Sequence, residues 1–260
     1  MFLSDNIPIL IKLPNTKEYV DIYFVHDMHF GSELFNSKKW YKLKNIILND
    51  DNAYVCFVGD MLENAIPSSK HCDVFSQTHT PAEQKEWVTQ QFKDLAHKTI
   101  AVVPGNHEHN RTTKMSGMYP LYDCCLLAGI GEKYRDTIAF IDVALGKNGG
   151  RVNKLTHYFG QIQHVAKDLE NYHSSDYTDG IDFFACGHDH KPKDRPRKKL
   201  VFDPHNKVVY ERNVECINCG SFCKFGGYGA KGAMRPQSDK LYKLRLFGKA
   251  KTMETYGFYL

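Results

Sequence analysis

Side chains suited to binding divalent cations occur in four short segments of this sequence. They are carboxylates, one amide and several imidazoles, a mixed set that suits borderline cations such as Mn²⁺, Fe²⁺ or Zn²⁺. The set contains no thiolate, which argues against a structural zinc cage. Its members are Asp27, His29, Asp60, Asn106, His107, His188 and His190. Together they predict a metal site of the catalytic kind rather than a purely structural one.

Each segment directly follows a short apolar run of the kind that forms a buried strand. The runs cover residues 19–25, 53–58, 99–103 and 181–186. Gly105 permits a tight turn after the third run. Because ligands bind at the carboxyl ends of strands in open α/β sheets, we expect the polar side chains to meet at one sheet edge.

The four segments, taken in order, resemble the motifs of the calcineurin-like metallophosphoesterase superfamily. They read DMH at 27–29, GD at 59–60, GNHE at 105–108 and GHDH at 187–190, with helix-sized gaps between them. A lone GD would be a weak signal, whereas the ordered set is specific. The resemblance implies an α/β fold with a two-sheet β-sandwich flanked by helices, in four layers α/β/β/α.

The resemblance also implies a role for each residue. One metal ion is held by Asp27, His29, Asp60 and His190, and a second is held by Asp60, Asn106, His157 and His188, so that Asp60 bridges the two. His107 is adjacent to a ligand and is placed to stabilise the transition state or protonate the leaving oxygen. Asp60 and His107 are therefore the expected catalytic residues, and the cofactor is two divalent ions, with Mn²⁺ preferred over Fe²⁺ or Zn²⁺.

The isolated histidine of the second metal has two candidates. His157 ends the strand-like run 152–157, and the resemblance places the ligand there, although Tyr158 and Phe159 stand where a glycine usually follows. His164 is the alternative, but it lies in the helix-like stretch 161–171. On this ground the sequence favours His157.

The implied activity is a dinuclear-metal-dependent phosphoesterase that hydrolyses phosphate esters with a metal-activated hydroxide. The segment GDMLENA at 59–65 lacks the arginine that the protein Ser/Thr phosphatases carry after the bridging aspartate. This disfavours a protein phosphatase, and the charge distribution described next favours a phosphodiesterase or nuclease. The alternatives are a small-molecule phosphomonoesterase or protein phosphatase of the same superfamily, and a non-catalytic interaction module on the same fold.

The charge distribution adds nucleic acid as the expected partner. Residues 191–260 hold 16 Lys and Arg against 6 Asp and Glu, although the net charge of the chain is only +4. The densest basic run, 191–199, directly follows His190, and its two prolines predict an extended loop. Such a run is either a solvated charged loop or a rim that attracts backbone phosphates.

The rest of the chain must position these residues. The spacing of apolar residues predicts a helix over 37–49, and Thr80-Pro81-Ala82-Glu83 predicts a capped helix start. Residues 200–202 and 208–212 are expected to form a hairpin, and the carboxyl-terminal strands 241–247 and 255–260 are expected to complete a second sheet. A chain of 260 residues with eight cysteines, read as reduced thiols, and no signal peptide predicts a single domain over 1–260 in the cytoplasm, with no membrane span.

Overall fold

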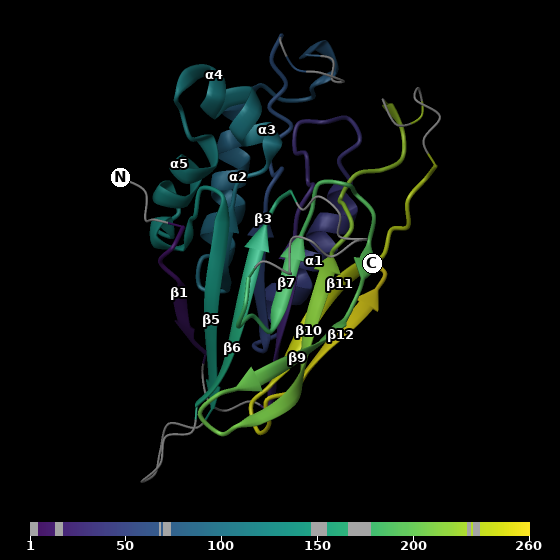
Figure 1. Cartoon of the computed structure of the whole chain (residues 1–260). Coiled ribbons are helices and arrows are strands. Elements are labelled where there is room, and N and C mark those ends of the chain that lie inside the picture. Colours follow the sequence, from purple (N-terminus) through teal and green to yellow (C-terminus); the bar gives the residue numbers. More distant parts are fainter. Residues whose placement is uncertain are drawn as a thin grey trace.

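Two β-sheets packed face to face form the body of the molecule, and helices cover one of them (Figure 1). The computed structural model describes residues 5–13, 18–67, 69, 74–146, 155–165, 178–227, 230 and 235–260. The two packed sheets and their helices confirm the predicted two-sheet β-sandwich flanked by helices.

The smaller sheet carries three of the four motif strands. Its five strands lie in the order β12-β11-β2-β3-β4, with β2, β3 and β4 parallel and β11 and β12 antiparallel to their neighbours. Their bounds are β2 Tyr19–Val25, β3 Ala53–Val58, β4 Thr99–Val103, β11 Leu241–Phe247 and β12 Met253–Phe258. Parallel pairing brings the carboxyl ends of β2, β3 and β4 to the same edge.

The larger sheet carries the fourth motif strand. Its path is β1-β5-β6-β7-β10-β8, and β9 pairs with β10 to extend the sheet as a hairpin. The bounds are β1 Ile9–Lys12, β5 Ile138–Gly146, β6 Leu155–Gln163, β7 Phe183–Cys186, β8 Lys193–Asp194, β9 Arg197–Asp203 and β10 Val208–Asn218. Strands β6, β7 and β10 are mutually parallel, so their carboxyl ends also share an edge.

The main core lies between the two sheets. It contains β-branched and aromatic side chains from both, including Ile22, Phe24, Ile141 and Phe183. Gly160 is required here, because a Cβ at that position would lie 2.0 Å from the Phe183 ring. This close approach lets the ring fill the space over β6.

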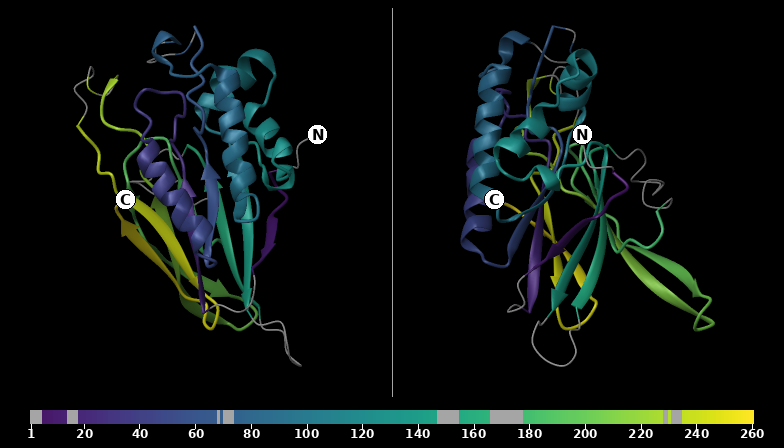
Figure 2. Two further views of the ribbon diagram at one scale, coloured as in Figure 1. Left: turned by 180° about the vertical axis from the view of Figure 1, so that it is seen from behind. Right: turned by 90° about the vertical axis from the view of Figure 1, so that its left-hand side faces the viewer.

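A second core lies between the five-stranded sheet and three helices. Figure 2 shows these helices against the sheet from behind and from the side. Trp40, Val88 and Leu121 each come from a different helix and pack with Val55 and Phe57 of β3. The helices are α1 Ser37–Asn49, α2 Pro81–Leu95 and α5 Pro120–Leu127, with the short segments η1 Val74–Ser76, α3 Asn106–Glu108, η2 His109–Thr113, α4 Lys114–Ser116 and η3 Gly131–Lys133. None of the helices in the described ranges is long and apolar enough to cross a membrane.

Two details differ from the sequence-based expectation. Strands β11 and β12 join the smaller sheet beside β2, rather than completing the larger one. In the described part of the chain, the long helices α1, α2 and α5 all pack on the five-stranded sheet, so the expected fourth, helical layer over the other sheet is not among the described residues.

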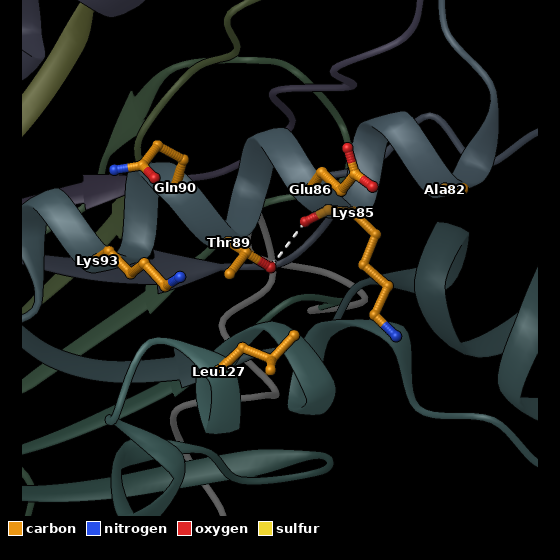
Figure 3. A pocket seen from close by; sticks show the side chains of 7 residues that line it. All are labelled: Ala82, Lys85, Glu86, Thr89, Gln90, Lys93 and Leu127. Atoms are coloured by element: carbon orange, nitrogen blue, oxygen red, sulfur yellow. Dashed lines mark hydrogen bonds between the residues drawn. The ribbon is translucent and has the colours of Figure 1, made fainter.

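A surface depression between α2 and α5 lies away from the strand ends. Its lining is Ala82, Lys85, Glu86, Thr89, Gln90, Lys93 and Leu127, and the Thr89 hydroxyl donates to the Lys85 carbonyl over 2.8 Å (Figure 3). None of the motif residues lines it. The motif residues lie elsewhere, at the carboxyl ends of the strands.

The start of α2 provides a test of the sequence-based helix prediction. Thr80 caps the helix through the Glu83 amide, and the Glu83 carboxylate accepts from the Thr80 amide over 2.7 Å. We expect Thr80→Ala to lower the free energy of unfolding by about 1 kcal/mol, because one amide loses its partner. Thr80→Ser keeps the hydroxyl and should unfold at nearly the wild-type urea concentration. Equal destabilisation by both variants would argue against the cap.

Candidate metal centre

Side chains from both sheets converge at the shared carboxyl ends of their strands. Groups of potential metal-binding atoms lie within 4.8 Å of one another in four overlapping sets. These sets join Asp27, His29 and Asp60; Asp60, His164 and His188; His29, Glu63 and His107; and His29, His190 and Cys223. The structure thus brings together all the motif residues predicted from the sequence, since Asn106 bonds to His164 and His188. It also adds His164, Glu63 and Cys223.

The backbone of this cluster is strained. Seven non-glycine residues in the described part of the chain have positive φ, and five of them are Asp27 (47°), His29 (50°), Asp60 (52°), His188 (82°) and His190 (57°). Each such residue costs on the order of 1–3 kcal/mol and persists only where its surroundings fix it. Backbone strain concentrated on the predicted ligands is the pattern that a functional site would show.

Hydrogen bonds between loops hold this backbone in place. The amides of Met28 and His29 both donate to the Asp60 carbonyl, each over 2.9 Å. The buried carboxylate of Glu108 accepts from the amides of Asp60, Leu62 and Gly105 over 2.8–3.1 Å. Glu108 therefore joins the loop after β3 to the loop after β4 and helps to fix the geometry of the site.

Asp27 presents one oxygen to the cluster. Its Oδ2 accepts from His26 Nδ1 over 2.5 Å and from the His188 amide over 2.8 Å. Its Oδ1 is buried and has no hydrogen-bond partner in the described part of the chain. Because an unpaired buried carboxylate oxygen is costly, this atom is suited to a metal ion. His26, for which the sequence suggested no role, fixes the orientation of this carboxylate.

Asp60 lies at the centre. Its Oδ1 accepts from the His107 amide over 2.8 Å, and its Oδ2 faces His164 Nε2 at 3.1 Å and His29 Nε2 at 3.9 Å. Gly105 is required beside it, because a Cβ there would lie 2.1 Å from Asp60 Oδ1. Oδ2 is thus directed between the two groups of imidazoles, as a bridging ligand must be.

The imidazoles on one side of Asp60 are oriented by a carboxylate. His29 Nε2 lies 3.2 Å from His190 Nε2, and His29 Nδ1 lies 3.2 Å from Glu63 Oε2. A carboxylate behind a ligand histidine fixes its ring and tautomer and increases its basicity. Glu63 therefore acts on the cluster through His29.

The imidazoles on the other side meet at Asn106. Asn106 Oδ1 lies 2.8 Å from His188 Nδ1 and 3.2 Å from His164 Nε2. His164 Nδ1 donates to the Val58 carbonyl over 2.8 Å, which leaves Nε2 free to face the cluster. The three side chains and Asp60 Oδ2 form a second set of potential ligands.

The structure corrects the sequence prediction for the isolated histidine. His157 lies within β6, its side chain is 44% exposed, and its Nδ1 pairs with Asp142 Oδ1 at 2.9 Å. Strand β6 continues to Gln163, so His164 is the residue at its carboxyl end, about 23 Å further along the strand than His157. The prediction was wrong because the strand-like run was ended too early. The rule that ligands follow strands selects His164.

Two residues near the cluster were not predicted. Arg111 Nη2 donates to His107 Nε2 over 2.8 Å, and its Nη1 pairs with Glu63 Oε1 at 3.1 Å. The signal in the sequence was the four-residue spacing from His107, which puts both on one face of a helix. Cys223, expected to be an ordinary thiol, lies within 4.8 Å of the ring nitrogens of His29 and His190.

The electrostatics of the cluster favour a cation. Burial raises the pKa of Asp60, but the surrounding imidazoles outweigh burial and hold it well below its usual range. Burial lowers the pKa of His164, but the carboxylates of Asp60 and Asp27 outweigh it and raise the pKa to about 10. Carboxylates, an amide oxygen and imidazoles around such negative charge fit borderline divalent ions.

The correction at His164 leads to a direct test. We expect His164→Ala to lower the bound metal by about one ion per chain, because it removes a nitrogen facing Asp60 and Asn106. His157→Ala is the matched control and should keep the wild-type metal content, since its side chain faces solvent. Elemental analysis after equilibration with Mn²⁺ and gel filtration measures both. Metal loss from the His157 variant alone would return the role to that residue.

Comparisons with known proteins give only loose likenesses. No protein-family model matches the sequence, and no curated protein sequence does. Among solved structures, the chain is similar to a conserved uncharacterized protein, a predicted phosphoesterase, from Streptococcus pneumoniae, with 11% identity and a TM-score of 0.38 over 94% of this chain and 100% of that one. It is also similar to Vps29 of Chaetomium thermophilum, with 10% identity and a TM-score of 0.39 over 92% and 95%. At these scores neither likeness carries an argument, and the function is argued from the site.

Proposed function

We propose that this protein is a metal-dependent phosphoesterase whose active centre is the cluster at the strand ends. The observation that carries the proposal is the buried, unpaired Asp27 Oδ1 directed at the imidazoles of His29, His164 and His190, 3.7–3.9 Å away. Together with the bridging position of Asp60, it supports a site for two divalent ions rather than a set of polar strand caps.

The two ions would be held by overlapping sets of ligands. Asp27, His29, Asp60 and His190 would hold one, and Asp60, Asn106, His164 and His188 would hold the other. When bound, such a metal pair lowers the pKa of a shared water and neutralises the phosphate oxygens during in-line attack. The protein positions its ligands in advance, through the strained backbone and through His26, Glu63 and Glu108.

His107 occupies the rim of the cluster rather than its centre. Its Nδ1 donates to the Glu63 carbonyl over 3.0 Å, and its Nε2 lies 3.9 Å from Asp60 Oδ2. From there the ring can stabilise the transition state or exchange a proton with the leaving oxygen. Burial and the nearby cations lower its pKa to about 4 in the metal-free protein, against the opposing charge of Asp60.

A substrate panel tests the proposal. Phosphomonoesters and phosphodiesters should be hydrolysed when Mn²⁺ is added, and hydrolysis should cease when a chelator removes it. A protein that binds two ions per chain but hydrolyses none of these esters would instead be a binding module on this fold.

Two substitutions separate metal binding from catalysis. We expect Asp60→Asn to abolish turnover and reduce metal content, because it removes the charge shared by both ions. His107→Asn should keep both ions and lower the rate by about 10²- to 10⁴-fold, the usual contribution of general acid catalysis. Elemental analysis and initial rates distinguish the two. If the His107 variant lost metal as severely as the Asp60 variant, His107 would be a ligand instead.

We further propose that the substrate is a phosphodiester of nucleic acid, supported by the basic hairpin β9–β10. The hairpin projects from the body of the molecule (Figure 2) and bears Arg197, Lys198, Lys199, Lys207 and Arg212. Phe202 and Tyr210 on the same hairpin are 64% and 46% exposed, so they could stack on bases. A polyanion would be held by its backbone phosphates, without sequence preference.

The basic run begins beside the metal centre, where Lys193 pairs with Asn218, and extends away from it along the hairpin. Asn218, at the end of β10, bonds to Asp189 between two predicted ligands. Arg197 pairs with Val214, and Lys199 pairs with Arg212, so they lie about 13 and 20 Å from Asn218 along the strand. Only an extended ligand could contact the hairpin and the centre together.

Charge neutralisation on this run tests the nucleic-acid proposal. The variant replaces Arg195, Arg197, Lys198 and Lys199 with Gln. We expect weaker DNA cleavage and a salt dependence that flattens by about 0.9 per lost phosphate contact, while hydrolysis of a small chromogenic diester stays unchanged.

A control variant removes the same number of charges from other exposed lysines. It replaces Lys12, Lys38, Lys42 and Lys93 with Gln. Equal loss of DNA cleavage in both variants, or no DNA cleavage by the wild type with Mn²⁺, would contradict the nucleic-acid substrate and leave a small-molecule phosphoesterase.

A further inference from the structure

Arg111 is a cation at the rim of the metal centre, and only some of its N–H donors are used by the hydrogen bonds of the described structure. A guanidinium group has five N–H donors. The two N–H groups of Nη1 donate to the Glu63 carbonyl and to Glu63 Oε1, and one N–H group of Nη2 donates to His107 Nε2. The other two have no acceptor among the residues that the structure describes. The side chain is 12% exposed, so the group is held in place yet reachable by a ligand.

The guanidinium lies close to the centre of the cluster. Nη2 is 2.8 Å from His107 Nε2, which is 3.9 Å from Asp60 Oδ2, so Nη2 lies within 6.7 Å of that oxygen whatever the angle between the two contacts. A phosphoryl group held at the metal centre would therefore lie within reach of the remaining N–H donors.

The local fold presents Arg111 toward the centre. It follows His107 by four residues along α3 and the π-helical η2, which stacks the two side chains on one face. Asn64 secures this segment, since its side-chain amide donates to the His107 carbonyl over 3.3 Å and also to Thr112. The guanidinium is therefore positioned before any ligand arrives.

We propose that Arg111 is the phosphate-binding residue of this site, donating to non-bridging oxygens of the substrate phosphoryl group. The inference rests on the proposed phosphoesterase function. A planar guanidinium matches two phosphate oxygens and is worth more than a point charge for this purpose. Glu63 then has two roles, because one carboxylate oxygen orients His29 and the other orients Arg111. The Glu63 side chain thus holds both His29, a proposed metal ligand, and Arg111, the proposed phosphate-binding residue.

Phosphate binding tests this proposal without relying on turnover. Inorganic phosphate is titrated calorimetrically into the Mn²⁺-loaded protein. We expect Arg111→Gln to weaken binding by about 10- to 100-fold, the loss typical of hydrogen bonds to a charged group. Arg111→Lys should give an intermediate loss because it keeps the charge but not the fork. Lys114→Gln is the matched control, an exposed cation on the same segment, and should bind phosphate like the wild type.

Metal content and catalysis distinguish the other outcomes. Arg111→Gln should keep the wild-type metal content. If it lost metal together with phosphate affinity, Arg111 would be a structural support for Glu63 and His29, and the proposal would fail. Phosphate affinity equal to that of Lys114→Gln would also overturn it. If the wild type bound phosphate through Arg111 but hydrolysed no ester, the phosphoesterase proposal would fail while the assignment of Arg111 would stand.

Discussion

The burial of two carboxylates at neighbouring strand ends is the constraint on which the structure of the site depends. Asp27 and Asp60 are almost completely buried, yet the charges around them hold the pKa of each carboxyl below its ordinary value. A buried carboxylate remains ionised only where hydrogen bonds or cations compensate for the lost water. Each has one oxygen held by protein donors and one directed at imidazoles. The oxygens directed at the imidazoles are the ones that divalent ions would bind.

The sandwich itself creates the site, because neither sheet supplies a complete set of ligands. The five-stranded sheet contributes Asp27, His29, Asp60 and Asn106, and the larger sheet contributes the histidines that follow β6 and β7. Packing of Phe24 against Phe183 in the core between the sheets, with ring centroids 6.1 Å apart, sets how closely the two edges approach. Core packing and ligand geometry are therefore coupled, and loosening the core would spread the ligands.

The sequence predicted local features well and long-range pairing poorly. Helix α1 has the predicted bounds, and the motif residues meet as expected, because apolar spacing and strand-end position are local signals. The placement of β11 beside β2 depends on pairing across more than 200 residues, which no local pattern encodes. His164 was ranked second to His157 for a related reason, since β6 continues through polar residues such as Gln161 and Gln163, which are buried and bonded to each other. The position of Arg111 at the site could not be predicted from the sequence, because only the fold brings it next to Glu63.

Cationic side chains lie at two different distances from this site, and the distance determines what each group can do. Arg111 lies within hydrogen-bond distance of His107, so in the proposed role it would act on the reacting phosphate of any substrate. The charges of Arg197 and Lys199 begin about 13 Å from the end of β10, beyond the screening length of about 8 Å at physiological salt. They can therefore add little to the stabilisation of a small ester at the centre. They would gain effect only on a polyanion long enough to contact the hairpin while one of its phosphates lies at Asp60. If the substrate is the proposed nucleic acid, the hairpin would therefore select for substrate length rather than reactivity.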